Sequence, residues 1–100
     1  MGLRKKQSKF TRMVADLIRF ADDNGYELTF GDAWAKTGHR QYSLHYDRLA
    51  IDLNLFKAGR YLTATEDHRP LGEYWESIGG SWGGRFKDGN HYSLEYRGRR

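Results

Sequence analysis

The chain has 100 residues, a formal net charge of +4 and no cysteine. Disulfides and thiolate-ligated metals are therefore excluded, and any metal site must use His, Asp or Glu. The hydrophobic fraction of 38% and the charged fraction of 30% are typical of a folded globular chain and not of a disordered one. We expect residues 1–100 to form a single domain.

The charge is distributed unevenly along the chain. Basic residues gather in tails at about residues 1–9 and 97–100, whereas residues 13–96 hold nine Lys and Arg against thirteen acids, a net charge of −4. The tails either solubilise the chain or attract a polyanion such as nucleic acid or an anionic cell wall. No apolar run approaches the ~20 residues of a membrane helix, so no membrane insertion is expected. No apolar segment follows the basic N-terminus, so we expect synthesis in the cytoplasm without a signal peptide.

Hydrophobic periodicity predicts the elements of the first half. Residues 8–24 place apolar side chains at helical spacing, with Ser8 as N-cap and Gly25 as the stop signal. Residues 26–34 alternate between apolar and polar side chains and predict a strand. Residues 35–41 are polar and predict a loop.

Residues 49–56 predict a second strand with an unusual face. Ile51, Leu53 and Leu55 point one way, and Asp52 points the other way. A carboxylate in the middle of such a strand is costly to bury unless it is paired or bound to a metal. Asp52 is therefore the most informative single residue of the sequence.

The second half completes an α+β pattern. Residues 61–62 return as a short strand of a hairpin, residues 66–78 predict a helix, and residues 91–96 predict a final strand. Pro70 fits either the first turns of that helix or a break between two short ones. This order predicts an α+β domain, a small antiparallel sheet with flanking helices.

Two histidines and one carboxylate are a ligand set typical of a catalytic zinc ion, and His45, Asp52 and His91 offer one. His45 and Asp52 are seven residues apart, an odd spacing, so His45 must lie in the loop that enters the strand and turn back. Asp88 precedes His91 across a Gly-Asn turn and is the candidate general base for a metal-activated water.

The other histidines and the tryptophans are expected to have mainly structural roles. A lone histidine is more often a core or surface residue than a ligand, and we expect His39 in a polar loop and His68 on a solvated face. The tryptophans are more typical of a core or a cleft wall than of a carbohydrate platform. Trp82, closely flanked by glycines, is the best candidate to line a substrate cleft.

The motif Ser43-x-His45-x6-Asp52, followed downstream by Trp82-Gly83-Gly84 and by Asp88-Gly89-Asn90-His91, resembles the LAS-type zinc peptidases. This group comprises D-Ala-D-Ala carboxypeptidases and L-Ala-D-Glu endopeptidases of the hedgehog/D-Ala-D-Ala peptidase-like fold, and the likeness is to its short phage and prophage members. The resemblance covers about residues 10–96.

The resemblance implies a zinc metallopeptidase that hydrolyses stem peptides of bacterial peptidoglycan, with one Zn²⁺ per chain. His45, Asp52 and His91 match the family's zinc ligands and Asp88 its general base. Ser43 matches a residue that contacts the substrate near the metal. The bond that is cut, L-Ala-D-Glu or one beside D-Ala, stays open.

One family feature is missing. Many members carry an arginine after the strand equivalent to residues 28–34, where it steadies the substrate carbonyl. Here the sequence reads Trp34-Ala35-Lys36, so Lys36 or Arg40 is left to supply the positive charge.

The expected biological setting is a phage or prophage lytic enzyme. We expect a monomer whose partner is peptidoglycan and which reaches the wall after release by a separate membrane-permeabilising protein. Two alternatives are a phage structural protein that keeps the peptidase fold without activity and a basic nucleic-acid-binding module. No nucleic-acid partner is expected, because the basic residues are terminal and are not interleaved with aromatics.

Overall fold

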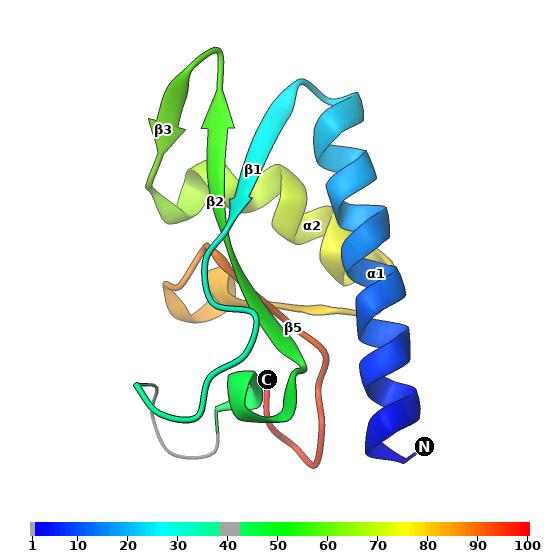
Figure 1. Cartoon of the computed structure of the whole chain (residues 1–100). Helices are drawn as coiled ribbons and strands as arrows, with labels where there is room; N and C mark the ends of the chain where they lie inside the picture. The colour runs from blue at the N-terminus through cyan, green and yellow to red at the C-terminus, as the bar shows by residue number, and fades with distance from the viewer. Residues whose placement is uncertain (1, 39–42) are drawn as a thin grey trace.

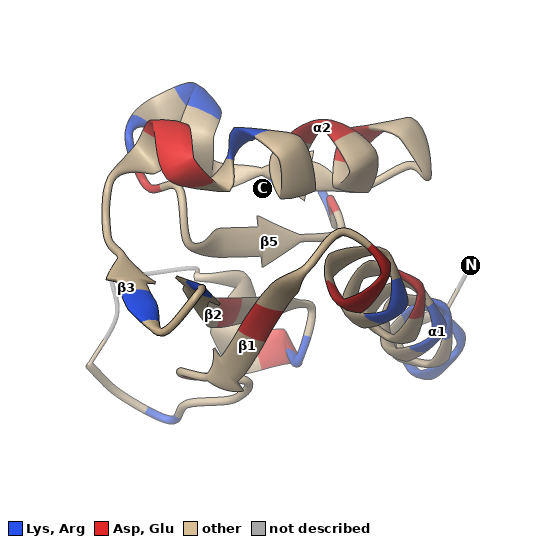
Figure 2. Ribbon diagram, turned by 90° about the horizontal axis from the view of Figure 1, so that it is seen from above, with Lys and Arg blue, Asp and Glu red and all other residues tan. Residues whose placement is uncertain are grey.

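The structure, a computed structural model, describes residues 2–38 and 43–100. Two helices cover one side of a small antiparallel sheet (Figures 1 and 2). The α-helices and strands are, in chain order, α1 Leu3–Asp23, β1 Tyr26–Phe30, β2 Ala50–Lys57, β3 Arg60–Leu62, α2 Arg69–Ser77, β4 Ser81–Trp82 and β5 His91–Ser93. Three short 3₁₀ helices complete the list: η1 Leu44–Asp47, η2 Thr65–His68 and η3 Gly83–Phe86. The predicted α+β class is confirmed, and the predicted helices and strands occur in the predicted order with one further strand, β4, that was not predicted.

The first helix starts earlier than predicted. It begins at Leu3 and not at residue 8, so most of the N-terminal basic residues lie in its first two turns. Arg, Lys and Gln are good helix formers, and no Pro or Gly interrupts residues 3–9, so Ser8 does not act as a cap. Leu3 also packs against the edge of the core. The predicted end at Asn24 and Gly25 is confirmed, with Gly25 at φ 82°.

The sheet is organised around β2. Its C-terminal half pairs with β1, from Tyr26↔Lys57 to Phe30↔Leu53, and with β3 on the opposite side. Its N-terminal half pairs with β5 on the same side as β3. β4 pairs with β5 at the far edge of the sheet. Burial alternates along β2 as the sequence predicted.

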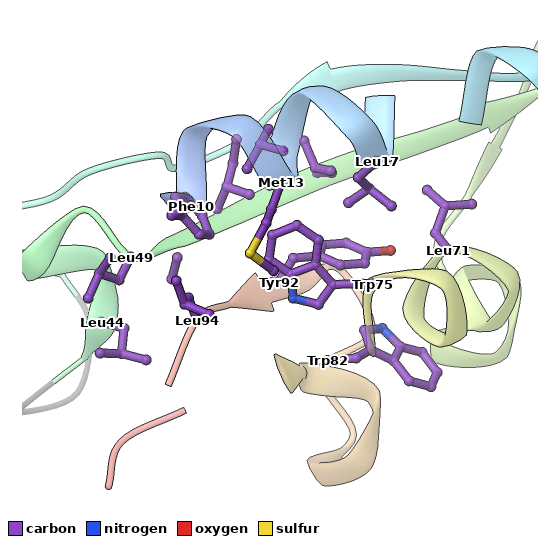
Figure 3. Packing of buried hydrophobic residues seen from close by; sticks show 14 of the residues in the cluster. Phe10, Met13, Leu17, Leu44, Leu49, Leu71, Trp75, Trp82, Tyr92 and Leu94 are labelled. Carbon is purple, nitrogen blue, oxygen red and sulfur yellow. The ribbon is translucent and has the colours of Figure 1, made fainter. Parts of the chain in front are cut away.

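The core lies between the sheet and both helices (Figure 3). Leu17 of α1, Trp75 of α2 and Tyr92 of β5 are fully buried there. The ring of Phe10 meets that of Trp75 edge-on, with centroids 5.7 Å apart. The indole N–H of Trp75 donates to the carbonyl of Ser93 at 2.9 Å, which ties α2 to β5.

Two predicted strand ends were wrong, and one alternative for the second helix is confirmed. β1 ends at Phe30, four residues before the predicted end at residue 34, because the following segment leaves the regular ladder. The predicted helix 66–78 is divided into two short helices, η2 and α2, with Pro70 in the first turn of α2. β5 ends at Ser93, and Tyr96 instead forms an isolated bridge with Arg99.

Candidate metal centre

Asp52 lies on the sheet face that the helices leave uncovered. Its neighbours Ile51 and Leu53 are 4% and 0% exposed and face the core, whereas the Asp52 side chain is 21% exposed. The period of two along a strand places Asn54 and Phe56 on the same outward face. β2 thus contributes to the core and to the candidate site with alternate residues.

His91 stands directly opposite Asp52. The β2–β5 register pairs the two residues, and paired residues of an antiparallel ladder share one face. The Nδ1 atom of His91 lies 3.4 Å from Asp52 Oδ1. The predicted position of His91 at the start of the last strand is confirmed.

His45 reaches Asp52 from a short turn and not from the strand, as its odd spacing required. It lies in η1, where the Ser43 hydroxyl caps the turn by accepting the His45 N–H at 3.2 Å. The chain then reverses, and Leu49 N–H donates to the carbonyl of Leu44 at 3.0 Å. His45 is 2% exposed, and its Nε2 lies 3.2 Å from Asp52 Oδ1.

The three side chains fit a zinc ion. One ligand atom from each of His45, Asp52 and His91 lies within 4.8 Å of the others. Zinc–ligand distances of about 2.0–2.2 Å in a tetrahedron place ligand atoms about 3.4 Å apart. The two nitrogen–oxygen separations at Asp52, 3.2 and 3.4 Å, match that spacing. Two imidazole nitrogens and one carboxylate also leave a fourth position for water or substrate.

The same contacts shift the acidity of Asp52. Burial by itself raises the pKa of this carboxyl, but hydrogen bonds from His45 and His91 and their positive charge when protonated lower it well below its usual range. Asp52 is therefore ionised at neutral pH, which is the form that binds a metal.

Asp88 lies in a tight turn immediately before β5. Its N–H donates to the carbonyl of Gly83 at 2.9 Å, and its carbonyl accepts the N–H of His91 at 3.1 Å. Gly83 must be glycine, because a Cβ there would lie 2.3 Å from Asp88 O and 2.7 Å from His91 Cβ. The Asp88 side chain is exposed, and Asp88 is outside the three-residue cluster formed by the described residues. This position leaves the Asp88 side chain exposed to solvent.

Two distant segments hold η1 in place. The side-chain amide of Gln7 in α1 donates to the carbonyl of Asp47 at 2.8 Å. The guanidinium of Arg99, near the C-terminus, pairs with the Asp47 carboxylate. Both basic ends of the chain therefore belong to the folded domain and support the turn that carries His45.

Of the predicted substrate-binding residues, Ser43 and Lys36 lie in the described part of the chain, and Arg40 does not. Ser43 is 8% exposed and orients the His45 turn, so any substrate contact it makes would be additional to that role. Lys36 is exposed, with its Nζ 5.9 Å from the centre of the Trp34 ring. Arg40, like His39, lies outside the described residues. Lys36 and Arg40 therefore stay predictions.

The prediction that Trp82 lines a substrate cleft was wrong. Trp82 is 1% exposed, and its indole N–H donates to the carbonyl of Gly89 at 2.8 Å. A Cβ on Gly72 or on Gly84 would lie only 2.1 or 2.2 Å from the Trp82 ring. The glycines near this ring therefore make room for it in the core and do not expose it.

The expected solvated position of His68 was also wrong. His68 is 2% exposed, and its Nδ1 lies 2.7 Å from the hydroxyl of Tyr92. Burial lowers the pKa of His68, although the charge of Asp67 opposes that shift. The histidine that the sequence placed near charged neighbours is thus a buried structural residue.

Sequence analysis missed a row of side chains beside the candidate metal site. On the same open face, the Asn54 amide donates to the Thr29 hydroxyl at 3.2 Å, and the Tyr61 hydroxyl donates to Asn54 Oδ1 at 3.4 Å. The spacing of Asn54, two residues after Asp52, was the available signal. The partners on β1 and β3 depend on register and left no local signal.

A sequence model of the D-alanyl-D-alanine carboxypeptidase family matches residues 36–94, more than half of the chain. The matched segment includes all three residues of the cluster and Asp88. A search of the curated proteins gave no match. In the part of the chain that the structure describes, no helix is long and apolar enough to cross a membrane.

Proposed function

We propose, from the premise that this chain belongs to the D-alanyl-D-alanine carboxypeptidase family of peptidases, that it is a zinc-dependent hydrolase of peptidoglycan stem peptides. The observation that carries the proposal is the convergence of His45, Asp52 and His91 at ligand spacing on an open sheet face.

The ligand atoms in this proposal are His45 Nε2, a carboxylate oxygen of Asp52 and His91 Nδ1. Bound zinc would supply a Lewis acid that polarises the substrate carbonyl and acidifies water. The protein holds both imidazoles with these nitrogens toward Asp52. The η1 turn positions His45, and the β2–β5 register positions His91. Both histidines are buried, so few alternative ring positions compete.

Asp88 is the proposed general base. Its exposed carboxylate accepts the proton of the attacking water and then passes that proton to the amine of the leaving group. The hydrogen bonds of the Asp88 backbone to Gly83 and His91 fix the turn that carries this carboxylate, three residues before the proposed ligand His91. Lys36 or Arg40 is the proposed cation for the charge that develops on the substrate carbonyl oxygen.

The proposed setting is the bacterial cell wall. The two candidate bonds are L-Ala-D-Glu and a bond beside D-Ala, and the family description favours the second. We further propose that the chain acts as a monomer in a phage or prophage lytic enzyme and meets the wall after its release from the cytoplasm.

The test is digestion of purified peptidoglycan, with the released peptides identified by mass spectrometry. Asp88→Asn is expected to lower kcat about 10²–10⁴-fold, because it removes a general base, and to leave zinc content unchanged. Asp16→Asn, at an exposed position of α1, is the matched control and is expected to act like the parent. Equal activity of the folded Asp88→Asn protein and the parent would contradict the role of Asp88.

A further inference from the structure

A small cavity opens beside Asp88, on the side of the metal cluster where β3 and η2 lie. Its volume is about 200 Å³. The lining residues come from the β2–β3 hairpin, from η2 and from the turn before β5: Leu53, Asn54, Tyr61, Leu62, Thr63, Thr65, His68, Lys87, Asp88, Gly89 and Asn90. Drug-sized ligands fill pockets of about 300–1,000 Å³, so this cavity suits one small amino-acid residue and not a sugar chain.

The cavity adjoins the candidate metal centre from two directions. Asn54 follows the ligand Asp52 by two residues on the same strand face. Asp88 and Asn90 lie three residues and one residue before the proposed ligand His91, and the Asn90 carbonyl accepts the N–H of Leu53 at 2.9 Å. A peptide whose scissile bond lies at the metal cluster can therefore place a neighbouring residue in the cavity.

The chemistry of the lining is polar, with one cation. Hydroxyl and amide groups come from Asn54, Thr63, Thr65 and Asn90, and Lys87 is the positively charged side chain among the lining residues. The remaining ionisable groups are the Asp88 carboxyl, the Tyr61 phenol and His68. Burial lowers the pKa of His68, and its Nδ1 is engaged by a phenol oxygen, so it adds no charge at neutral pH. Lys87 alone is suited to pair with an anion there.

The backbone holds Lys87 at this rim in an uncommon conformation. Lys87 has φ 65°, in the left-handed region that non-glycine residues rarely adopt, and it caps the end of η3. The next peptide N–H, that of Asp88, bonds to Gly83 and closes the turn.

We propose that this cavity binds the C-terminal residue of the substrate peptide and that Lys87 pairs with its free carboxylate. The inference rests on the proposed function, because it assumes a peptide with its scissile bond at the cluster. It assigns the cavity to the leaving-group side of that bond and makes the protein a carboxypeptidase. Lys87 then supplies recognition of the chain end, a role separate from that of Lys36 or Arg40 at the carbonyl.

The experiment is a nitrogen-15 NMR titration of the full chain in a chelator, so that no peptide is cleaved. The probes are N-acetyl-D-alanyl-D-alanine and its C-terminal amide. The free acid is expected to shift the amide signals of residues 87–90 and of Asn54 and to bind about fivefold more tightly than the amide, as an exposed ion pair allows. Lys87→Gln is expected to remove that preference, and Lys87→Arg to keep it.

Arg97→Gln is the matched control, because Arg97 is also an exposed cation with a positive φ of 51° but does not line the cavity. It is expected to keep the preference for the acid. Equal binding of acid and amide by the parent, or an unchanged preference in Lys87→Gln, would overturn the inference. Since binding is read without zinc or turnover, such a result is distinguishable from a failure of hydrolysis, which would count against the proposed function.

Discussion

The two faces of β2 differ in burial and in polarity: one is apolar and buried, and the other is polar and open. Ile51, Leu53 and Leu55 pack against the helices and are at most 4% exposed. Asp52 and Asn54 point to the open face, where one meets two histidines and the other meets Thr29 and Tyr61. Successive residues of β2 thus belong alternately to the core and to the candidate site.

This contrast explains how a chain of 100 residues can hold a polar site without losing its core. A strand turns every second side chain away from the helices, so the site takes residues that the core does not use. The supporting segments α1, η1 and the C-terminal residues then hold the histidine that the strand itself cannot carry. Substitutions on the two faces should therefore have separable effects on stability and on metal binding.

The largest effect on stability is expected on the core face. Leu53→Ala should lower the free energy of unfolding by about 2–5 kcal/mol, because Leu53 is fully buried and a cavity remains. Asn54→Ala, the next residue, should change it by less than about 1 kcal/mol, because its hydrogen bonds are exposed. Denaturant titration of both variants measures the difference. Equal losses in the two would contradict the division of β2 into two faces.

A smaller effect on stability is expected when the ion pair between Arg99 and Asp47 of η1 is removed. Arg99→Gln removes the ion pair with Asp47 and should weaken zinc binding about tenfold, the lower end for residues that orient metal ligands. The pair is partly exposed, so the free energy of unfolding should fall by no more than about 1 kcal/mol.

Competition with a chelator of known affinity measures the zinc affinity of Arg99→Gln. Arg97→Gln is the control, because the Arg97 guanidinium lies over the Tyr96 ring, 5.1 Å from its centre, whereas Arg99 is the residue that pairs with Asp47. A zinc affinity equal to that of the parent would show that η1 holds His45 without the Arg99 contact.

The smallest effect concerns His68, away from the metal. Burial lowers the pKa of His68, whereas the unfolded chain takes up a proton near pH 6.5. Its contribution to stability is therefore complete above about pH 6.5 and is lost as the pH falls through the folded pKa. His68→Gln should flatten this part of the profile of unfolding free energy against pH. If the unfolding free energies of parent and variant changed with pH in the same way, the lowered pKa of His68 would be contradicted.

The strand periods, the ligand candidates and the order of the elements other than β4 could be predicted, because each depends on local sequence pattern. The outward face of Asp52 followed from alternation alone, and the odd spacing to His45 required a turn. The direct opposition of Asp52 and His91 could not be predicted, because register depends on packing of the whole sheet.

Contacts between distant segments account for most of what was missed. The Arg99–Asp47 pair joins residues 52 apart, and the cavity at Lys87 is built by three separate segments, so neither has a local signal. Trp82 was misjudged because its flanking glycines suggested an open loop, whereas Gly84 makes room for the buried ring and Gly83 makes room for Asp88 and His91. Glycine in a sequence does not tell these two uses apart.

The central claim is that the outward face of β2 carries a zinc ligand, and zinc titration by calorimetry tests it most directly. The parent and Asn54→Ala are expected to bind one zinc per chain. Asp52→Ala is expected to stay folded and to lose zinc affinity by about a thousandfold, about 4 kcal/mol at 1.4 kcal/mol per tenfold. Zinc binding by Asp52→Ala as tight as that of the parent, or no binding by the parent, would contradict the account.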